Sequence, residues 1–345
     1  MQPIAEGSRL CLIAGLEHGI RPPLDTSERL WRVSGSALDP WLTLLAALRL
    51  DAHALLGPAL ALDFLDDQWT QPELPTGELP QLYGLELRPL RIWRPLLDHL
   101  HEQLGAGRLV VLEPDAWGLP DTDGQEYRRQ HRRSTVIVND LDAANRRLGY
   151  FHRDGYFHLQ DEDFDALLHP CGPAAVLPPP AAVIELRGLV RRPADTLRHL
   201  ARQGLERQLE RVPTRHPVRR WARRCQRELD WLLHEGGEVH FQAWAEAGLR
   251  PLGASAELAA IHLRWLSGED SGSAHLLQAA DALRQLAVLA RALHLKGSRA
   301  AETGRPLEAG PMVERMARHW SRGMALLGAG EIVLDPPPGA LGRPR

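Results

Sequence analysis

The sequence predicts an α+β protein in which a domain with an antiparallel sheet is followed by a helical bundle. Short strand-like stretches follow one another with no long helix between them, at residues 108–113, 134–138, 147–151 and 156–159. Such a series is typical of an antiparallel sheet rather than a dinucleotide-binding fold. Beyond the prolines at 178–180, Leu, Ala and Trp recur at helical spacing, which indicates a bundle. We expect a first domain over 1–180, a bundle over 181–330 and a disordered tail over 331–345.

The first domain should also contain helices on either side of its first long strand. Residues 36–50 predict a helix, because Trp41, Leu44 and Leu48 fall on one face. Pro40 is tolerated in a first turn, and Ser36 or Asp39 can cap it. An apolar stretch, a strand and a helix are then expected at 52–64, 85–93 and 95–104. The bundle helices are expected at 194–211, 218–234, 239–247, 255–266, 272–295 and 312–327.

Composition excludes several classes of function. The chain has 345 residues and a net charge of −3, which predicts neither nucleic-acid nor membrane binding. Its three cysteines are widely spaced, so neither a disulfide framework nor a metal site is expected. The N-terminus lacks the features of a signal peptide, and no apolar run reaches the ~20 residues that span a bilayer. We therefore expect a cytoplasmic protein.

Polar residues concentrate between Leu112 and Tyr156. Strands of one sheet lie about 4.8 Å apart, so their end residues can meet across it. A histidine entering a strand, near an acid on a neighbouring strand, is typical of the general base of a hydroxyl or thiol nucleophile. His131 is the candidate base. In the alternative interpretation the acids cap turns and His131 binds a backbone group. The polar residues of this segment are Glu113, Asp115, Asp121, Tyr127, His131, Asp142 and His152.

Ser36 is the candidate nucleophile, because it stands at the start of the first long helix. The partial positive charge of a helix N-terminus stabilises a developing anion there. Serine is also among the best N-caps, and capping requires no catalysis. Both interpretations remain open from the spacing alone.

An arginine-rich strip follows the predicted helix 218–234. It is interpreted either as a solvated face or as a dock for an acidic partner or a phosphate, since arginine binds both well. The candidate partner-binding residues are Arg219, Arg220, Arg223 and Arg227.

Several segments resemble a bacterial family known as domain of unknown function number eighteen thirty-nine. They include LDFLDDQWT (62–70), LYGLELRPL (82–90), LEPDAWGLPDT (112–122), YRRQHRRST (127–135), LGYFHRDGY (148–156) and DEDF (161–164). The helical half is also similar over 241–266, so the resemblance covers most of the chain.

This resemblance implies a papain-like fold for the N-terminal half, similar to the acyltransferase of butirosin assembly. That enzyme moves an aminoacyl group from a carrier protein to an amine. The family has an Asn-Cys pair where Gly35 and Ser36 stand here, while Asp39 and Trp41 keep its pattern. Its YFHN becomes YFHR, which puts Arg153 where an amide would orient the imidazole.

The resulting hypothesis is an aminoacyl or acyl transferase that acts on a carrier-protein thioester. Ser36 would be the nucleophile, His131 the base and Asp142 or Asp154 the group that orients it. No intrinsic cofactor is expected, but the phosphopantetheine of a carrier protein is, with that carrier or an amino acid:carrier protein ligase as partner. A catalytically inactive accessory protein and a thioester or peptide hydrolase are the alternatives. The candidate substrate-binding residues are Asp39, Trp41, Glu113, Asp115, Asp121, Tyr127 and His152.

Overall fold

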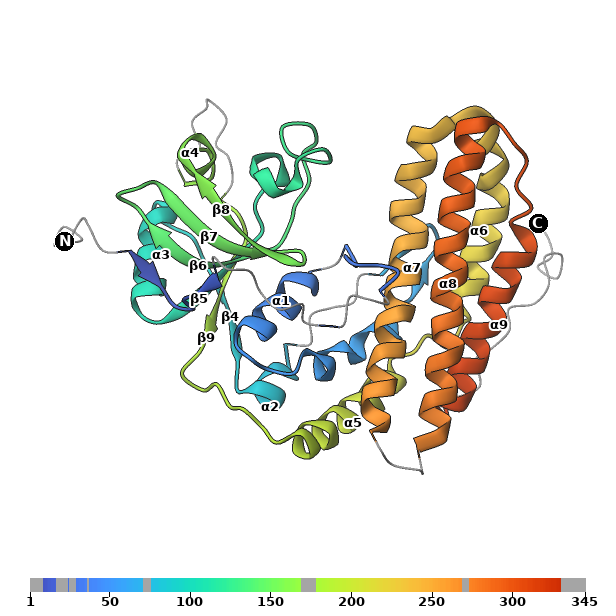
Figure 1. Ribbon diagram of the computed structural model, residues 1–345, viewed down its shortest axis with the longest axis horizontal. Coiled ribbons are helices and arrows are strands. Elements are labelled where there is room, and N and C mark those ends of the chain that lie inside the picture. The colour runs from blue at the N-terminus through green and yellow to red at the C-terminus, as the bar shows by residue number, and fades with distance from the viewer. Residues whose placement is uncertain are drawn as a thin grey trace, which may run out of the picture. The chain divides into compact units, whose positions relative to one another are not determined.

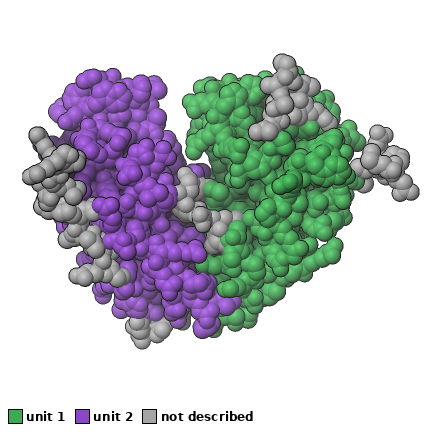
Figure 2. All heavy atoms as spheres, turned by 180° about the vertical axis from the view of Figure 1, so that it is seen from behind, with its two compact units in different colours: residues 1–26, 37–55, 74–197 green, residues 27–36, 56–73, 198–345 purple. Residues whose placement is uncertain are grey.

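The computed structural model describes residues 9–16, 24, 29–35, 37–70, 76–168, 178–268 and 273–329. The chain forms two compact units, shown in different colours in Figure 2. Unit 1 comprises residues 1–26, 37–55 and 74–197, and unit 2 comprises 27–36, 56–73 and 198–345. Residues 27–36 and 56–73 therefore group with the helical part of the chain, whereas the sequence predicted a single boundary at residue 180.

Unit 1 is built on an antiparallel sheet that has seven strands in the described part of the chain. Strands run in the order β4-β9-β5-β6-β7-β8, and β1 pairs with the far end of β6. The predicted antiparallel sheet is thus confirmed. The strands are β1 (Leu10–Cys11), β4 (Glu86–Leu90), β5 (Arg108–Leu112), β6 (Val136–Asp142), β7 (Arg147–His152), β8 (Gly155–Gln160) and β9 (Ala181–Glu185).

Strand β9 corrects the sequence interpretation, which ended the first domain at the prolines 178–180. It begins directly after them and lies between β4 and β5, paired with both. Its five residues follow three prolines, so no run of alternating residues marked it as a strand. The sheet is therefore completed only after the chain has passed the predicted linker.

Helices cover the sheet of unit 1 and enclose its core (Figure 1). Leu100 and Leu104 of α3 pack with Val138 of β6, Tyr150 of β7 and Phe164 of α4 in one buried cluster. Helix α1 packs on β6 and β7, with Leu44 and Leu45 fully buried. A 3-10 helix at Ala52–Ala61 replaces the apolar stretch expected there. The α-helices are α1 (Asp39–Ala47), α2 (Leu79–Tyr83), α3 (Leu96–Gly105) and α4 (Asp161–Leu168).

Unit 2 is a bundle of long helices, as Figure 1 shows, and it also contains the small β-hairpin of β2 and β3. The helices expected at 239–247 and 255–266 are one continuous helix, α7, which contains Pro251. Leu249 and Leu252 beside that proline are fully buried, so packing offsets the lost hydrogen bond. The elements are β2 (Phe64–Leu65), β3 (Gln68–Trp69), α5 (Ala194–Glu210), α6 (Pro217–Trp231), a π-turn (Leu232–Gly236), α7 (Gly237–Ser267), α8 (Ala274–Thr303) and α9 (Gly310–Leu326).

A segment preceding α1 is docked on the bundle of unit 2 by one buried carboxylate. Glu257 of α7 has no exposed surface and accepts hydrogen bonds from the backbone N–H groups of Leu30 and Trp31 at 2.8 and 3.0 Å. The guanidinium groups of Arg29 and Arg284 pair with the same carboxylate. Since each oxygen has several donors, the buried charge is compensated.

Candidate functional site

Three side chains of unit 1 form an unbroken hydrogen-bonded chain from a serine through a histidine to an aspartate. The Oγ of Ser134 lies 2.6 Å from Nε2 of His152, and Nδ1 of His152 lies 2.5 Å from Oδ2 of Asp121. The side chains of His152 and Asp121 are 1% and 2% exposed, whereas Ser134 is half-buried. The serine is therefore the member of the three that solvent or a ligand can reach.

The LPDT segment forms a tight turn that places Asp121. Leu119 is buried in the core, and Pro120 opens a 3-10 turn over Pro120–Thr122. The hydroxyl of Thr122, which has no exposed surface, donates to the backbone carbonyls of Leu119 and Ala116. Because both ends of the turn are fixed, the Asp121 carboxylate is held pointing at the sheet.

Strand β7 supplies two partners for that carboxylate because its side chains alternate. Tyr150 and His152 are two residues apart and lie on one face of the sheet, whereas Phe151 points to the other. The hydroxyl of Tyr150 donates to Oδ1 of Asp121 at 2.5 Å. Burial and then the Asp121 charge raise the pKa of Tyr150 far above its ordinary value, so the phenol remains a donor.

This arrangement fixes the proton on the imidazole. An aspartate that accepts from Nδ1–H leaves Nε2 as an acceptor, and the Ser134 hydroxyl is the donor in reach. The same order of groups lets a histidine take the proton of a serine while the carboxylate stabilises the imidazolium that forms. The geometry therefore suits activation of Ser134 as a nucleophile.

A second set of contacts closes the loop of residues 120–133 over His152. Glu126 is buried and accepts from Arg132 at 3.1 Å and from Arg153, which follows His152. Arg153 also donates to Gln125 at 3.0 Å. Arg153 thus binds the loop, and Asp121 orients the imidazole of His152.

His131 belongs to a separate pair on the surface. Its Nδ1 lies 2.6 Å from Oδ2 of Asp115, and its ring stacks on Trp117 with centroids 5.7 Å apart. The His131 side chain is 77% exposed. Burial opposes ionisation of Asp115, but the hydrogen bonds from His131, Trp117 and Arg132 prevail and lower the pKa of Asp115. The carboxylate that orients His131 is therefore that of Asp115.

The two aspartates expected to orient His131 lie in hairpin turns. Asp142 accepts from the backbone and side-chain N–H groups of Asn145, which lower its pKa, and it closes the turn between β6 and β7. Asp154 is exposed in the turn between β7 and β8. Asp142 thus serves the turn-capping role that was the alternative interpretation. Ser36 lies outside the described residues.

The remaining candidate substrate-binding residues are spread over unit 1. Trp41 is 1% exposed and Asp39 is 6% exposed, so Trp41 fills the core. Glu113 is half-exposed, with Arg133 3.9 Å away. The hydroxyl of Tyr127 donates to Asp163 at 3.0 Å. Asp121 and His152 of the predicted set are joined directly by a hydrogen bond.

The start of α1 lies close to this chain. The hydroxyl of Thr43, in the first turns of α1, donates to the backbone carbonyl of Arg153 at 3.0 Å. That carbonyl belongs to the residue that follows His152. The helix that the sequence predicted to carry the nucleophile is therefore packed at the end of the strand that carries His152.

The arginines of α6 are largely occupied within unit 2. Arg220 pairs with Asp63, and Arg224 pairs with Glu228. The Nε of Arg219 is buried without a hydrogen-bond partner, and Arg227 is exposed. Part of the strip thus holds the β2–β3 hairpin region to α6.

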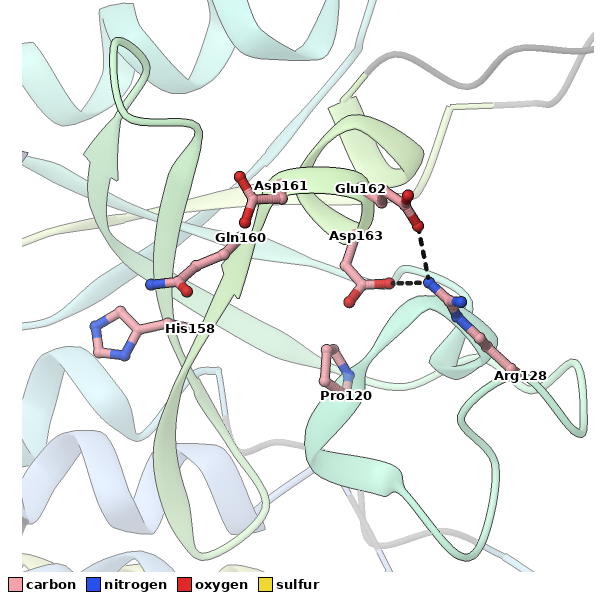
Figure 3. Close-up of a pocket in the computed structure, with 7 residues that line it drawn as sticks. All are labelled: Pro120, Arg128, His158, Gln160, Asp161, Glu162 and Asp163. Atoms are coloured by element: carbon pink, nitrogen blue, oxygen red, sulfur yellow. Dashed lines mark hydrogen bonds and ion pairs between the residues drawn. The ribbon is translucent and has the colours of Figure 1, made fainter.

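A pocket of about 450 Å³ opens at the junction of β8 and α4 (Figure 3). Arg128 reaches Asp163 at 3.3 Å and Glu162 at 3.6 Å across it. Pro120, directly before Asp121, forms part of its wall. Arg128 thus partly neutralises the acidic side chains that line the pocket. No group of three or more metal-ligating side chains occurs among the residues with described positions.

Ser134 is the residue that the sequence interpretation missed. It lies three positions after His131, where the sequence predicts only the start of a strand. Its segment, RRST, together with LPDT and YFH, carries the family resemblance, and these three segments supply Ser134, Asp121 and His152. The three segments can be recognised in the sequence, but the pairing of their side chains across the sheet cannot.

These features define an α+β protein with an antiparallel sheet, a helical C-terminal region and a serine-histidine-aspartate chain beside the start of β6 and the end of β7. The DUF1839 N-terminal domain model matches residues 20–185, and the DUF1839 C-terminal domain model matches residues 194–329. The chain therefore belongs to the DUF1839 family. No curated protein matches it. Across the described segments, none of the helices is both long and apolar enough to cross a membrane.

Proposed function

We propose that the N-terminal region catalyses acyl transfer through a covalent intermediate on Ser134. The observation that carries this proposal is the chain from Ser134 through His152 to Asp121, with distances of 2.6 and 2.5 Å. A nucleophile, a base and an orienting carboxylate in this order are what acyl transfer to a serine requires.

In the first step the Ser134 oxygen attacks the acyl carbonyl while His152 takes the hydroxyl proton at Nε2. The Asp121 carboxylate stabilises the imidazolium, because it accepts from Nδ1. The tetrahedral intermediate then expels the leaving group, which receives the proton from His152. In the second step an acceptor gives its proton to His152 and attacks the ester on Ser134, restoring the free hydroxyl.

The proposed donor is a thioester of an acyl or aminoacyl group on the phosphopantetheine of a carrier protein. Its support is the resemblance of the family to the butirosin-type acyltransferase, together with the packing of helix α1 against the strand that carries His152. Thr43 and Arg153 make that contact here. A thioester is already activated, so the reaction needs no metal or nucleotide. An amine is the proposed acceptor.

A thiol-release assay with acyl thioesters of N-acetylcysteamine tests this proposal. The purified chain should release thiol faster when an amine acceptor is present. Ser134→Ala and His152→Ala should each lower the rate at least about a thousandfold, as for other serine nucleophile–base pairs. Ser36→Ala and His131→Ala are the matched controls and should retain most of the activity.

Each outcome separates one alternative. Release that is independent of the amine would identify a hydrolase that uses the same residues. Activity that survives in Ser134→Ala but not in Ser36→Ala would assign the nucleophile to Ser36. A folded chain without thiol release would leave the accessory-protein alternative, in which a carrier protein is bound but not acylated.

A further inference from the structure

Helix α9 presents a stripe of arginines to solvent on the face opposite to its core face. Val313, Met316, Ala317, Trp320 and Met324 are buried against the bundle. The exposed stripe consists of Arg315, Arg318 and Arg322, spaced three and four residues apart. Such spacing aligns side chains on one helix face, over about 10 Å at 1.5 Å per residue.

The charge of this α9 stripe is mostly uncompensated. In the described part of the chain, Arg315 and Arg322 form no ion pair or hydrogen bond. Arg318 has one acidic neighbour, Glu314, at 3.7 Å, and both side chains are more than half exposed. Three guanidinium groups therefore face one carboxylate. The pKa of His319 is lowered by burial and then by Arg315, Arg322 and Arg318, as expected if their fields add there.

This stripe differs from the arginines of α6, which the sequence suggested for partner binding. Arg220 and Arg224 are already paired with Asp63 and Glu228 of the same unit. A partner would have to displace those carboxylates in order to bind Arg220 or Arg224, whereas it could bind Arg315 and Arg322 without breaking an ion pair. The chain as a whole has a net charge of −3, so the α9 stripe is a local feature.

We propose that the α9 stripe is the docking surface for an acidic helix of a protein partner. Carboxylates repeated at three- and four-residue intervals on such a helix match the arginine spacing and allow charge-assisted hydrogen bonds to each guanidinium. Nucleic acid fits less well, because its binding usually engages about six to ten phosphates and the chain is acidic overall. The proposal is independent of the chemistry at Ser134.

Fluorescence anisotropy with a labelled synthetic helix tests the proposal. The probe carries glutamates at positions i, i+3 and i+7 of one face, and it is titrated with the full chain. The triple variant R315E/R318E/R322E should bind at least about tenfold more weakly, and binding to the unchanged chain should fall as salt rises from about 50 to 300 mM.

The control is R211E/R299E/R305E, which changes the net charge equally at other exposed arginines. It should bind within about twofold of the unchanged chain if the α9 stripe is the site. Equal losses in both triple variants, or no binding of the glutamate helix at low salt, would overturn the proposal. The proposal would also be overturned if duplex DNA displaced the labelled helix at concentrations far below those at which the unlabelled helix displaces it. That result would assign the α9 stripe to nucleic acid. Melting curves of both variants verify that they are folded.

Discussion

Protonation of His216 should make unit 2 less stable in mild acid. His216 is the N-cap of α6 and is 1% exposed. Its Nδ1 accepts from the backbone N–H of Arg219 at 3.2 Å, and its Nε2–H donates to Oγ of Ser321 at 2.9 Å. Burial, and then the charge of Arg219, lower its pKa from 6.5 to about 4. Protonation removes the acceptor that caps the helix.

The size and sign follow from the two pKa values. Between pH 6.5 and about 4 the unfolded chain binds a proton at His216 that the folded chain does not. Stability is therefore fully present above pH 6.5 and is lost as the pH falls towards 4. A difference of about 2.5 pKa units at about 1.4 kcal/mol each gives about 3.5 kcal/mol.

The assay is urea unfolding followed by circular dichroism at several pH values, for the unchanged chain and for His216→Asn. Asparagine can still accept from the Arg219 N–H but does not titrate. Comparing the two proteins cancels the contributions of other histidines with lowered pKa, such as His294. The stability advantage of the unchanged chain should shrink from neutral pH to pH 4. An advantage that does not change with pH would refute the reasoning.

Three further predictions concern buried polar groups. Asp121→Asn should lower the thiol-release rate by about four orders of magnitude, because an amide can favour the tautomer of His152 that does not accept the proton of Ser134. A near-normal rate would contradict this prediction. Glu257→Gln should lower the free energy of unfolding by about 3 kcal/mol or more, because Arg29 is left buried without a counter-charge. A loss below about 1 kcal/mol in urea unfolding would contradict this prediction. Burial raises the pKa of the Cys225 thiol to about 12, so iodoacetamide at pH 8 should leave Cys225 unmodified until the chain unfolds. Peptide mass mapping measures the modification, and rapid labelling of Cys225 in the folded chain would contradict the prediction.

Local patterns predicted most of the elements. The sheet strands at β5, β7 and β8 and the helices α5, α8 and α9 lie where alternation or helical spacing placed them. Strand β9 was hidden because three prolines precede a run of only five residues. The division of α7 in two was wrong because buried packing around Pro251 outweighs the cost of the proline.

The candidate site shows where sequence reasoning stopped. Asp121 and His152 were recognised as polar residues in the right segment, but which residues pair depends on strand register. Val138 lies opposite Tyr150, and a register shift after Val138 sets how β6 meets β7. A register shift of this kind cannot be predicted from a single sequence. His131 was the more conspicuous histidine, and the structure gives it Asp115 as its partner.

Labelling with a fluorophosphonate tests most directly whether Ser134 is activated by His152. Such reagents form a phosphonate ester with a serine whose hydroxyl is deprotonated by a neighbouring base, and peptide mass mapping locates the adduct. We expect one adduct, on the peptide with Ser134, that is lost in His152→Ala and retained in His131→Ala. No adduct on the folded chain, or an adduct on Ser36 in its place, would contradict it.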